Sequence, residues 1–360
     1  SVTSVSLDAR HQERNSSKLL LGRKFLLLEQ FLSSSRFSSI LVSNLKNREW
    51  CKQFSLLLNR GKPDAILIHN IHSAPWPINI VKTALHHAPV VWTLHDCWSF
   101  LGSFYPRHST QPTKLLKKQI DSFWSTLSSK PPRHKLCAAT PSYWMKLEAQ
   151  KHAWSEYEVY SIHNPVPEFF FTDIDRKACK QALSLDETKT TVLCVAGNLD
   201  EERKGGGYLK DILNTNWGED VQFLTVGSGC ISSSFASKHR NLGFIHDELT
   251  LRIAYNASDI LLHPAPIDNL PNTVAESMAC GTPVLAFNTG GLPEMVVPNK
   301  SGWLVKEMNS NAIIDQLNSV LQSKQVNELR QSTKETARAL FNEEKAAEDY
   351  FEAFKHALSE

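Results

Sequence analysis

Short apolar runs recur along the chain, and polar residues or glycine follow each of them. Such runs are typical of buried strands in a parallel sheet, whereas apolar positions at a three-to-four-residue spacing over a longer stretch are typical of helices. The pattern predicts strands over residues 65–68, 89–94, 136–139, 159–162, 191–196, 221–226, 241–245, 260–263 and 284–287. It predicts helices over residues 18–32, 50–58, 249–257, 309–322, 325–338 and 342–358.

The alternation of strands with helices predicts an α/β protein with a parallel, doubly wound sheet in each half of the chain. A chain of 360 residues is too long for one typical domain and suits two. The proline-bounded segment His163-Asn164-Pro165-Val166-Pro167 is a stiff connection. We expect the domain boundary there.

Composition narrows the class of protein. The net charge of +2 is nearly balanced and gives no support to a nucleic-acid partner. The seven cysteines are scattered without a CxxC pair, which favours free thiols in a reducing cytosol over disulfides or a zinc site. No apolar run reaches the roughly 20 residues that a membrane span needs, and no signal-peptide pattern is visible. We therefore predict a cytoplasmic protein.

Two basic segments leave alternatives open. The helix predicted over residues 18–32 either turns its apolar face to the core or rests a basic face on anionic lipid. Residues 101–135 form an irregular segment with a helix inside it and a basic patch at 114–118. That patch is either a solvated face or a contact for an anionic acceptor or the inner membrane surface.

Polar side chains follow two predicted strands of the first half. His69 and His72 come after the strand at 65–68, and His95 with Asp96 come after the strand at 89–94. Open α/β sheets bind ligands at the carboxyl ends of their strands. Two histidines without a third ligand do not predict a metal site. His95 is either a core histidine or, as the following loop favours, a ligand-facing one.

The most informative stretch runs from Pro264 to Glu294 and reads PAPIDNLPNTVAESMACGTPVLAFNTGGLPE. Asp268 and Glu276 flank a segment that ends a loop and starts a helix near Asn272. A helix start offers free amides and a positive dipole end to phosphates. Glu276, one turn on, suits ribose hydroxyls, and Arg203-Lys204 supply cations after an earlier strand. Together these groups suit a diphosphate-linked nucleotide.

This stretch resembles the signature of glycosyltransferase family 4, the retaining GT-B enzymes, in which two acidic residues are separated by seven others. It looks most like the subset that builds bacterial surface polysaccharides, of the colanic-acid type. The segments HNIH, VVWTLHDCWSF, TPSYW and SIHNPVP resemble landmarks of that subset, in the same order. The resemblance covers roughly residues 60 to 305.

The resemblance implies a GT-B fold, in which two Rossmann-like domains face each other across a cleft. It implies an acceptor-side domain over residues 1–165, a nucleotide-sugar-binding domain over 166–338, and a final helix over 339–360 that packs back on the first domain. The family's first strand and glycine-rich turn are not found before Ser1, so we expect the N-terminal domain to be incomplete.

The resemblance also implies the residues of the site. It assigns catalytic roles to His95, Asp268 and Lys204, and donor binding to Asn198, Arg203, Gly227, Ile245, Asn269, Leu270, Asn272, Thr273 and Glu276. The implied donor is a UDP- or GDP-sugar, with no cofactor and no metal. In the implied retaining reaction, the leaving diphosphate helps to deprotonate the acceptor hydroxyl on the same face of the sugar.

The function implied is transfer of a hexosyl group to a glycan or lipid-linked oligosaccharide in surface-polysaccharide biosynthesis. Two departures keep an alternative open, a catalytically weak or inactive GT-B-like protein that binds a sugar nucleotide. They are the N-terminal elements not found before Ser1, and Asp268 at the first acidic position, where the family usually has Glu. A third departure is Asn198, which stands where many members have Arg, although Arg203 compensates for it in this interpretation. A nucleotide-sugar epimerase on the same scaffold fits less well, because the matched motifs are those of transferases.

Overall fold

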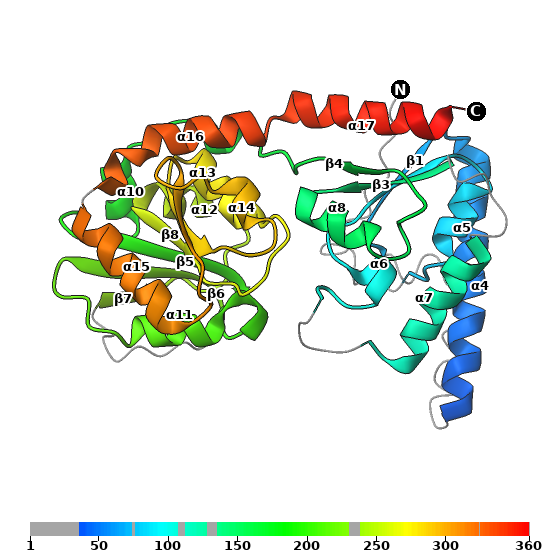
Figure 1. The fold of residues 1–360 in the computed structure, drawn as a ribbon, viewed down its shortest axis with the longest axis horizontal. Helices are drawn as coiled ribbons and strands as arrows, with labels where there is room; N and C mark the ends of the chain where they lie inside the picture. The colour runs from blue at the N-terminus through cyan, green and yellow to red at the C-terminus, as the bar shows by residue number, and fades with distance from the viewer. Residues whose placement is uncertain are drawn as a thin grey trace.

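The computed structural model describes residues 36–73, 76–106, 112–127, 135–229, 238–323 and 325–359. Two parallel sheets lie in these residues, one in each half of the chain, and helices flank both of them (Figure 1). The predicted α/β class, with a parallel sheet in each half, is confirmed. The helix predicted over residues 18–32 lies outside the described residues.

The N-terminal sheet has its strands in sequential order, and all of them are parallel. They are β1 (Ile66–His69), β2 (Val90–Thr93), β3 (Leu136–Thr140) and β4 (Val159–Ser161). Every residue of β2 and β3 is buried, as the continuous apolar runs in the sequence predict for the central strands of a parallel sheet.

Helices cover this sheet and fix the loops that follow its strands. They are α4 (Arg36–Gly61), η1 (Ile71–Ser73), α5 (Ile80–Leu85), α6 (Trp98–Leu101), α7 (Lys114–Leu127) and α8 (Tyr143–Gln150). Helix α7 confirms the helix expected inside residues 101–135. The prediction that a helix begins at Trp50 was wrong, because α4 begins at Arg36. Its first half contains three serines, which are moderate helix formers, and the helix as a whole is only weakly amphipathic, so its start was not recognised.

The C-terminal sheet has the order β10-β9-β8-β5-β6-β7. Its first strand, β5, is therefore central, with β6 and β7 on one side of it and β8, β9 and β10 on the other. Its strands are β5 (Thr190–Asn198), β6 (Val221–Ser228), β7 (His239–Asn241), β8 (Ile260–His263), β9 (Val284–Phe287) and β10 (Gly302–Val305). The order reverses between β5 and β8, and such a switch point is where open α/β sheets bind ligands.

The prediction of a strand over residues 241–245 was wrong in its bounds. Strand β7 ends at Asn241, whose Oδ1 accepts a hydrogen bond from the amide of Gly243 at 2.8 Å. The Gly227 amide of β6 still donates to the Gly243 carbonyl, but Gly243 has a φ of +70°, so the regular strand has ended and a side-chain-supported turn follows it. Leu242 and Ile245 therefore pack against the core from a loop.

Helices on both faces complete the C-terminal domain. They are α9 (Glu168–Phe171), α10 (Arg176–Ala182), η3 (Glu202–Lys204), α11 (Gly206–Leu213), α12 (Glu248–Ala257), α13 (Asn272–Ala279), α14 (Leu292–Met295), α15 (Ser310–Ser323), η5 (Gln325–Asn327) and α16 (Leu329–Leu340). Within the described residues, no helix is long and apolar enough to cross a bilayer.

The last helix, α17 (Glu343–Leu358), leaves the C-terminal domain and crosses to the N-terminal sheet (Figure 1). Its buried face is made of small residues, including Ala346 and Ala353, which pack with Val91 and Cys137. Small side chains let the helix lie close to β2 and β3. The end of the chain therefore belongs to the N-terminal core.

Candidate functional site

The candidate site lies at the switch point of the C-terminal sheet. The loop and short helix η3 that carry Arg203 and Lys204 follow β5, and the segment with Asp268 follows β8. Gly205 brings the two segments together. Its φ is +83°, and a Cβ there would lie 2.1 Å from the Pro264 carbonyl oxygen, so only glycine allows this approach.

Asp268 is buried, and both of its carboxylate oxygens have partners. Lys204 Nζ lies 2.6 Å from its Oδ2, and the Tyr105 hydroxyl donates to its Oδ1 at 3.0 Å. The backbone amide of Asn269 donates to the same Oδ1 at 3.0 Å. Tyr105 belongs to the N-terminal domain, so Asp268 joins the two domains as well as the two loops.

The charge of Asp268 is set by its neighbours. Burial alone raises the pKa of the carboxyl, but His263 and Lys204 outweigh burial and hold the pKa well below its ordinary value. His263 Nε2 is a buried nitrogen that makes no hydrogen bond among the described residues, and it lies 3.4 Å from Asp268 Oδ2. Asp268 is therefore an anion throughout the ordinary pH range.

Glu276 stands in a different environment on helix α13. It is half-buried, and the buried Tyr255 hydroxyl donates to its Oε2 at 2.9 Å. Burial raises the pKa of Glu276 to about 7, with Glu248 adding to the rise and Tyr255 opposing it. This carboxyl therefore titrates near neutral pH.

Helix α13 begins at Asn272, after Pro271. The first amides of a helix have no acceptor within the helix, so those of Asn272 and Thr273 suit an anion. Asn272 is exposed, and its Oδ1 accepts from Asn164 Nδ2 of the interdomain connection at 3.3 Å. Thr273 is half-buried.

Arg203 points toward the N-terminal domain. Its Nε donates to Glu201 at 2.8 Å, and its guanidinium lies 5.8 Å from the ring centre of Phe104 and 5.9 Å from that of Tyr105. Such cation–π contacts hold an arginine against an aromatic surface. Arg203 thus brings η3 into contact with the loop that carries Phe104 and Tyr105.

The other predicted donor-binding residues differ in exposure. Asn198 ends β5, is exposed, and accepts from the Asp200 amide at 3.0 Å. Gly227 is buried near the end of β6 and donates its amide to the Gly243 carbonyl at 2.8 Å. Leu270 is buried in the core. Ile245 is half-buried against the same core, one loop away from the switch point.

His95 comes from the N-terminal domain and meets the Asp268 segment. Its carbonyl accepts from Asn269 Nδ2 at 2.9 Å, and its Nε2 lies 2.9 Å from Nδ1 of His69. Burial first, and then His69, lower the pKa of His95 to about 4. His95 is therefore a neutral imidazole at pH 7.

His72 pairs with Asp96, whose Oδ2 lies 2.9 Å from its Nε2. In the part of the chain that the structure describes, no group of three or more His, Cys, Asp or Glu side chains is arranged to hold a metal ion.

Sequence reasoning missed several residues of this region. Tyr105, Tyr255 and His263 carried no motif signal, and Ser142 lay inside the quoted segment TPSYW but received no role. Glu294 lay inside the quoted stretch but received no role. The signal for Glu294 was its position three residues after the turn Gly290-Gly291, which follows the carboxyl end of β9.

Known proteins resemble this chain in sequence over its C-terminal half and in fold over most of its length. Residues 180–340 match the family model of glycosyl transferases group 1. The lipopolysaccharide 1,2-N-acetylglucosaminetransferase of Salmonella typhimurium is 26% identical over 168 residues, which are 46% of this chain and 40% of that relative. The chain thus spans less than half the length of this relative.

Two solved structures resemble most of the chain in fold. Sucrose-phosphate synthase from Thermosynechococcus elongatus has a TM-score of 0.69 at 18% identity, covering 86% of this chain and 77% of that one. Anabaena Alr3699/HepE in complex with UDP has a TM-score of 0.63 at 16% identity, covering 85% and 81%. At these identities the likeness shows the fold, which is GT-B. The sequence match to group 1 glycosyl transferases lies within the C-terminal domain.

Proposed function

We propose that this protein is a retaining glycosyltransferase. It transfers a hexosyl group from a UDP- or GDP-sugar to a glycan or lipid-linked oligosaccharide acceptor in surface-polysaccharide biosynthesis. The observation that carries the proposal is the arrangement of charged groups at the switch point between β5 and β8. Asp268, after β8, holds the Lys204 ammonium of the β5 loop, and the chain then starts α13, which carries the half-buried Glu276. The matches to group 1 glycosyltransferases and to a UDP complex support the same donor class.

Each group has a part in the proposed reaction. Glu276 accepts hydrogen bonds from the ribose hydroxyls, and the first amides of α13 bind the diphosphate. Lys204 exchanges its bond with Asp268 for one with the diphosphate and stabilises the charge that develops as the sugar leaves. Electrostatic stabilisation of this kind is commonly the largest catalytic contribution. The neutral His95 ring lies against the sugar from the other domain.

A second candidate is a GT-B protein that binds the donor and transfers the sugar weakly or not at all. The state of Asp268 favours it, because a carboxylate that is only 4% exposed and holds Lys204, Tyr105 and the Asn269 amide has little freedom to contact a sugar.

One experiment separates the two candidates. UDP- and GDP-sugars are titrated by calorimetry, and nucleotide release is then followed with and without glycan or lipid-linked acceptors. A transferase binds one donor and releases its nucleotide faster when the right acceptor is present. Donor binding without acceptor-stimulated release supports the second candidate. Failure to bind any nucleotide sugar contradicts both.

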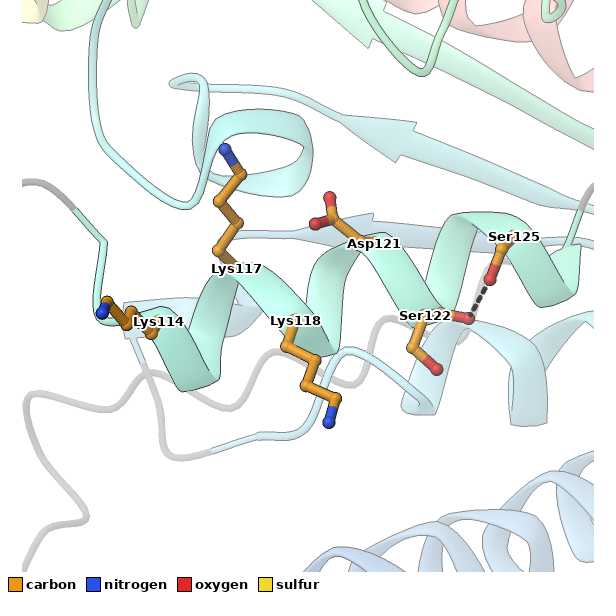
Figure 2. A pocket seen from close by; sticks show the side chains of 6 residues that line it. All are labelled: Lys114, Lys117, Lys118, Asp121, Ser122 and Ser125. Atoms are coloured by element: carbon orange, nitrogen blue, oxygen red, sulfur yellow. Dashed lines mark hydrogen bonds between the residues drawn. The ribbon is translucent and has the colours of Figure 1, made fainter.

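We also propose that the exposed face of α7 contacts an anionic acceptor or the inner membrane surface. Lys114, Lys117 and Lys118 line an open depression there together with Asp121, Ser122 and Ser125 (Figure 2). The helix is anchored by buried Ile120, Phe123 and Trp124 on its other face. Co-sedimentation with anionic vesicles, compared with neutral ones, tests this contact.

A further inference from the structure

The first turn of α8, in the N-terminal domain, is completed by a side chain of the C-terminal domain. Ser142 caps the helix from its own chain, because its Oγ accepts from the Met145 amide at 3.0 Å. The two preceding amides donate to the carboxylate of Glu294, one to each oxygen. The Tyr143 amide lies 2.7 Å from Oε2, and the Trp144 amide lies 2.7 Å from Oε1. Glu294 lies on α14, just beyond β9.

These two bonds are of a strong kind. The first amides of a helix have no acceptor within it, and the positive end of the helix dipole favours a carboxylate. Hydrogen bonds to an ionised acceptor are shorter and stronger than neutral ones. The pKa of Glu294 is held below its ordinary value although burial acts to raise it, because His163 and the two amides favour the anion. The cap therefore exists only while α8 and α14 touch.

A second link beside Glu294 leads directly to the candidate site. Asn269 accepts from the Ser142 hydroxyl and donates its Nδ2 to the His95 carbonyl at 2.9 Å. Ser142 and Asn269 are both buried, so breaking these bonds leaves buried polar groups unpaired. Because Asn269 follows Asp268 in the chain, contact between the domains is transmitted to the proposed sugar-facing residue.

The backbone is shaped for this contact at Gly291, which begins the turn into α14. A Cβ at this position would lie 1.8 Å from the Asn269 carbonyl oxygen and 3.0 Å from Ser142 Cβ. The Gly291 amide donates to the Asp268 carbonyl at 3.0 Å. The absence of a side chain at Gly291 thus lets three segments from two domains meet.

We propose that Glu294 is a positioning residue for the glycosyl transfer proposed above. By capping α8 it holds the two domains together, and this sets His95 beside Asn269 and Asp268. The inference rests on the proposed function. Glu294 acts on the alignment of the N-terminal side with the donor, and it leaves the groups that would bind the nucleotide, Lys204 and Glu276, in their own domain.

The test uses Glu294→Ala and Glu294→Gln in the full chain, with Glu307→Ala, an exposed glutamate of the same domain, as the matched control. Small-angle scattering measures the radius of gyration, and calorimetry and steady-state kinetics give the donor Kd and kcat. We expect Glu294→Ala to enlarge the radius and to lower kcat about tenfold to a hundredfold. The donor Kd stays within about threefold of the wild type. Glu294→Gln keeps one acceptor oxygen, so we expect its radius of gyration and its kcat to lie between those of the wild type and of Glu294→Ala.

A radius of Glu294→Ala equal to that of the wild type and of Glu307→Ala overturns the inference, whatever the activity. An enlarged radius with unchanged kcat overturns the positioning role. If the wild type neither binds nor turns over a nucleotide sugar, the proposed function fails. Scattering then decides by itself whether Glu294 holds the domains together.

Discussion

The two acidic residues of one motif, Asp268 and Glu276, have opposite environments. Asp268 is 4% exposed, contacts Lys204 and Tyr105, and has a pKa well below its ordinary value. Glu276 is half-buried, has one hydroxyl partner in Tyr255, and has a pKa raised to about 7. Eight positions therefore separate a permanent anion from a carboxyl that titrates near neutrality.

The contrast shows that spacing within a motif fixes where two carboxyls lie but not what charge they carry. The partners of Asp268 come from two other segments, one of them in the other domain, and burial dominates at Glu276. We expect Asp268 to contribute to the stability of the fold and the domain contact. We expect Glu276 to contribute to ligand binding at some expense of stability.

The largest effect is expected at Lys204. In Lys204→Met the buried Asp268 carboxylate loses its only lysine partner among the described residues, which lowers the free energy of unfolding by about 3 kcal/mol. Turnover falls on the order of a hundredfold, because the leaving diphosphate loses its cation. Urea unfolding and nucleotide release measure the two effects.

The double variant Lys204→Met/Asp268→Asn is the control for this pair. It removes both charges, so we expect much of the lost stability to return while activity stays low. If the stability lost in the double variant equals the sum of the losses in Lys204→Met and Asp268→Asn, the two side chains do not stabilise each other.

Substitutions of Glu276 are expected to act on binding instead. Glu276→Ala removes the acceptor for the ribose hydroxyls and weakens UDP binding about tenfold to a hundredfold. The raised pKa of Glu276 means that burial disfavours its charged form. At pH 8, where the wild-type carboxyl is charged, the free energy of unfolding of Glu276→Gln should therefore equal or exceed that of the wild type. Calorimetry and urea unfolding measure these quantities. Unchanged affinity for UDP in Glu276→Ala would mean that the ribose site lies elsewhere.

The pH dependence of binding follows from the same raised pKa. The carboxyl of Glu276 is protonated below about pH 7 and ionised above it, so donor affinity should rise as the pH increases through 7. The Tyr255 hydroxyl lowers this pKa, so Tyr255→Phe should move the midpoint to higher pH. The diphosphate of a nucleotide sugar has no ionisation near neutral pH, whereas the terminal phosphate of free UDP does, so the nucleotide sugar is the ligand to use. The difference between the wild type and Glu276→Gln, which cannot titrate, isolates the carboxyl. Identical profiles for wild type and Glu276→Gln would contradict the assignment.

The smallest effect is expected at Tyr105. Tyr105→Phe removes one hydrogen bond to Asp268 and lowers the free energy of unfolding by about 1 kcal/mol. Tyr143→Phe alters an exposed tyrosine and serves as the control. Equal stability of the two variants would show that the Tyr105 hydroxyl does not support Asp268.

Much of the fold follows from local sequence. Apolar runs marked the strands because a parallel sheet buries both faces of its central strands. The helix start at Asn272 was visible because proline precedes it and the apolar period of α13 follows. The end of β7 was misjudged, because a side-chain turn at Asn241 stops the strand although apolar residues continue after it.

The site was only partly predictable, for a physical reason. Tyr105 and Asp268 are 163 residues apart, and Glu294 and Trp144 are 150 apart. Such contacts depend on how two domains pack, and no local period records that packing. The charge of Asp268 and the contacts of Glu294 with α8 therefore became visible only in three dimensions.

The most direct test of the account is hydrogen–deuterium exchange of the full chain with and without a saturating mixture of UDP- and GDP-sugars. The account predicts slower exchange at the start of α13 and in the segments around Lys204 and Asp268. It predicts no change of similar size on the exposed face of α7. Unaltered exchange at residues 268–276, or slowing confined to other parts of the chain, would contradict a donor site at the switch point.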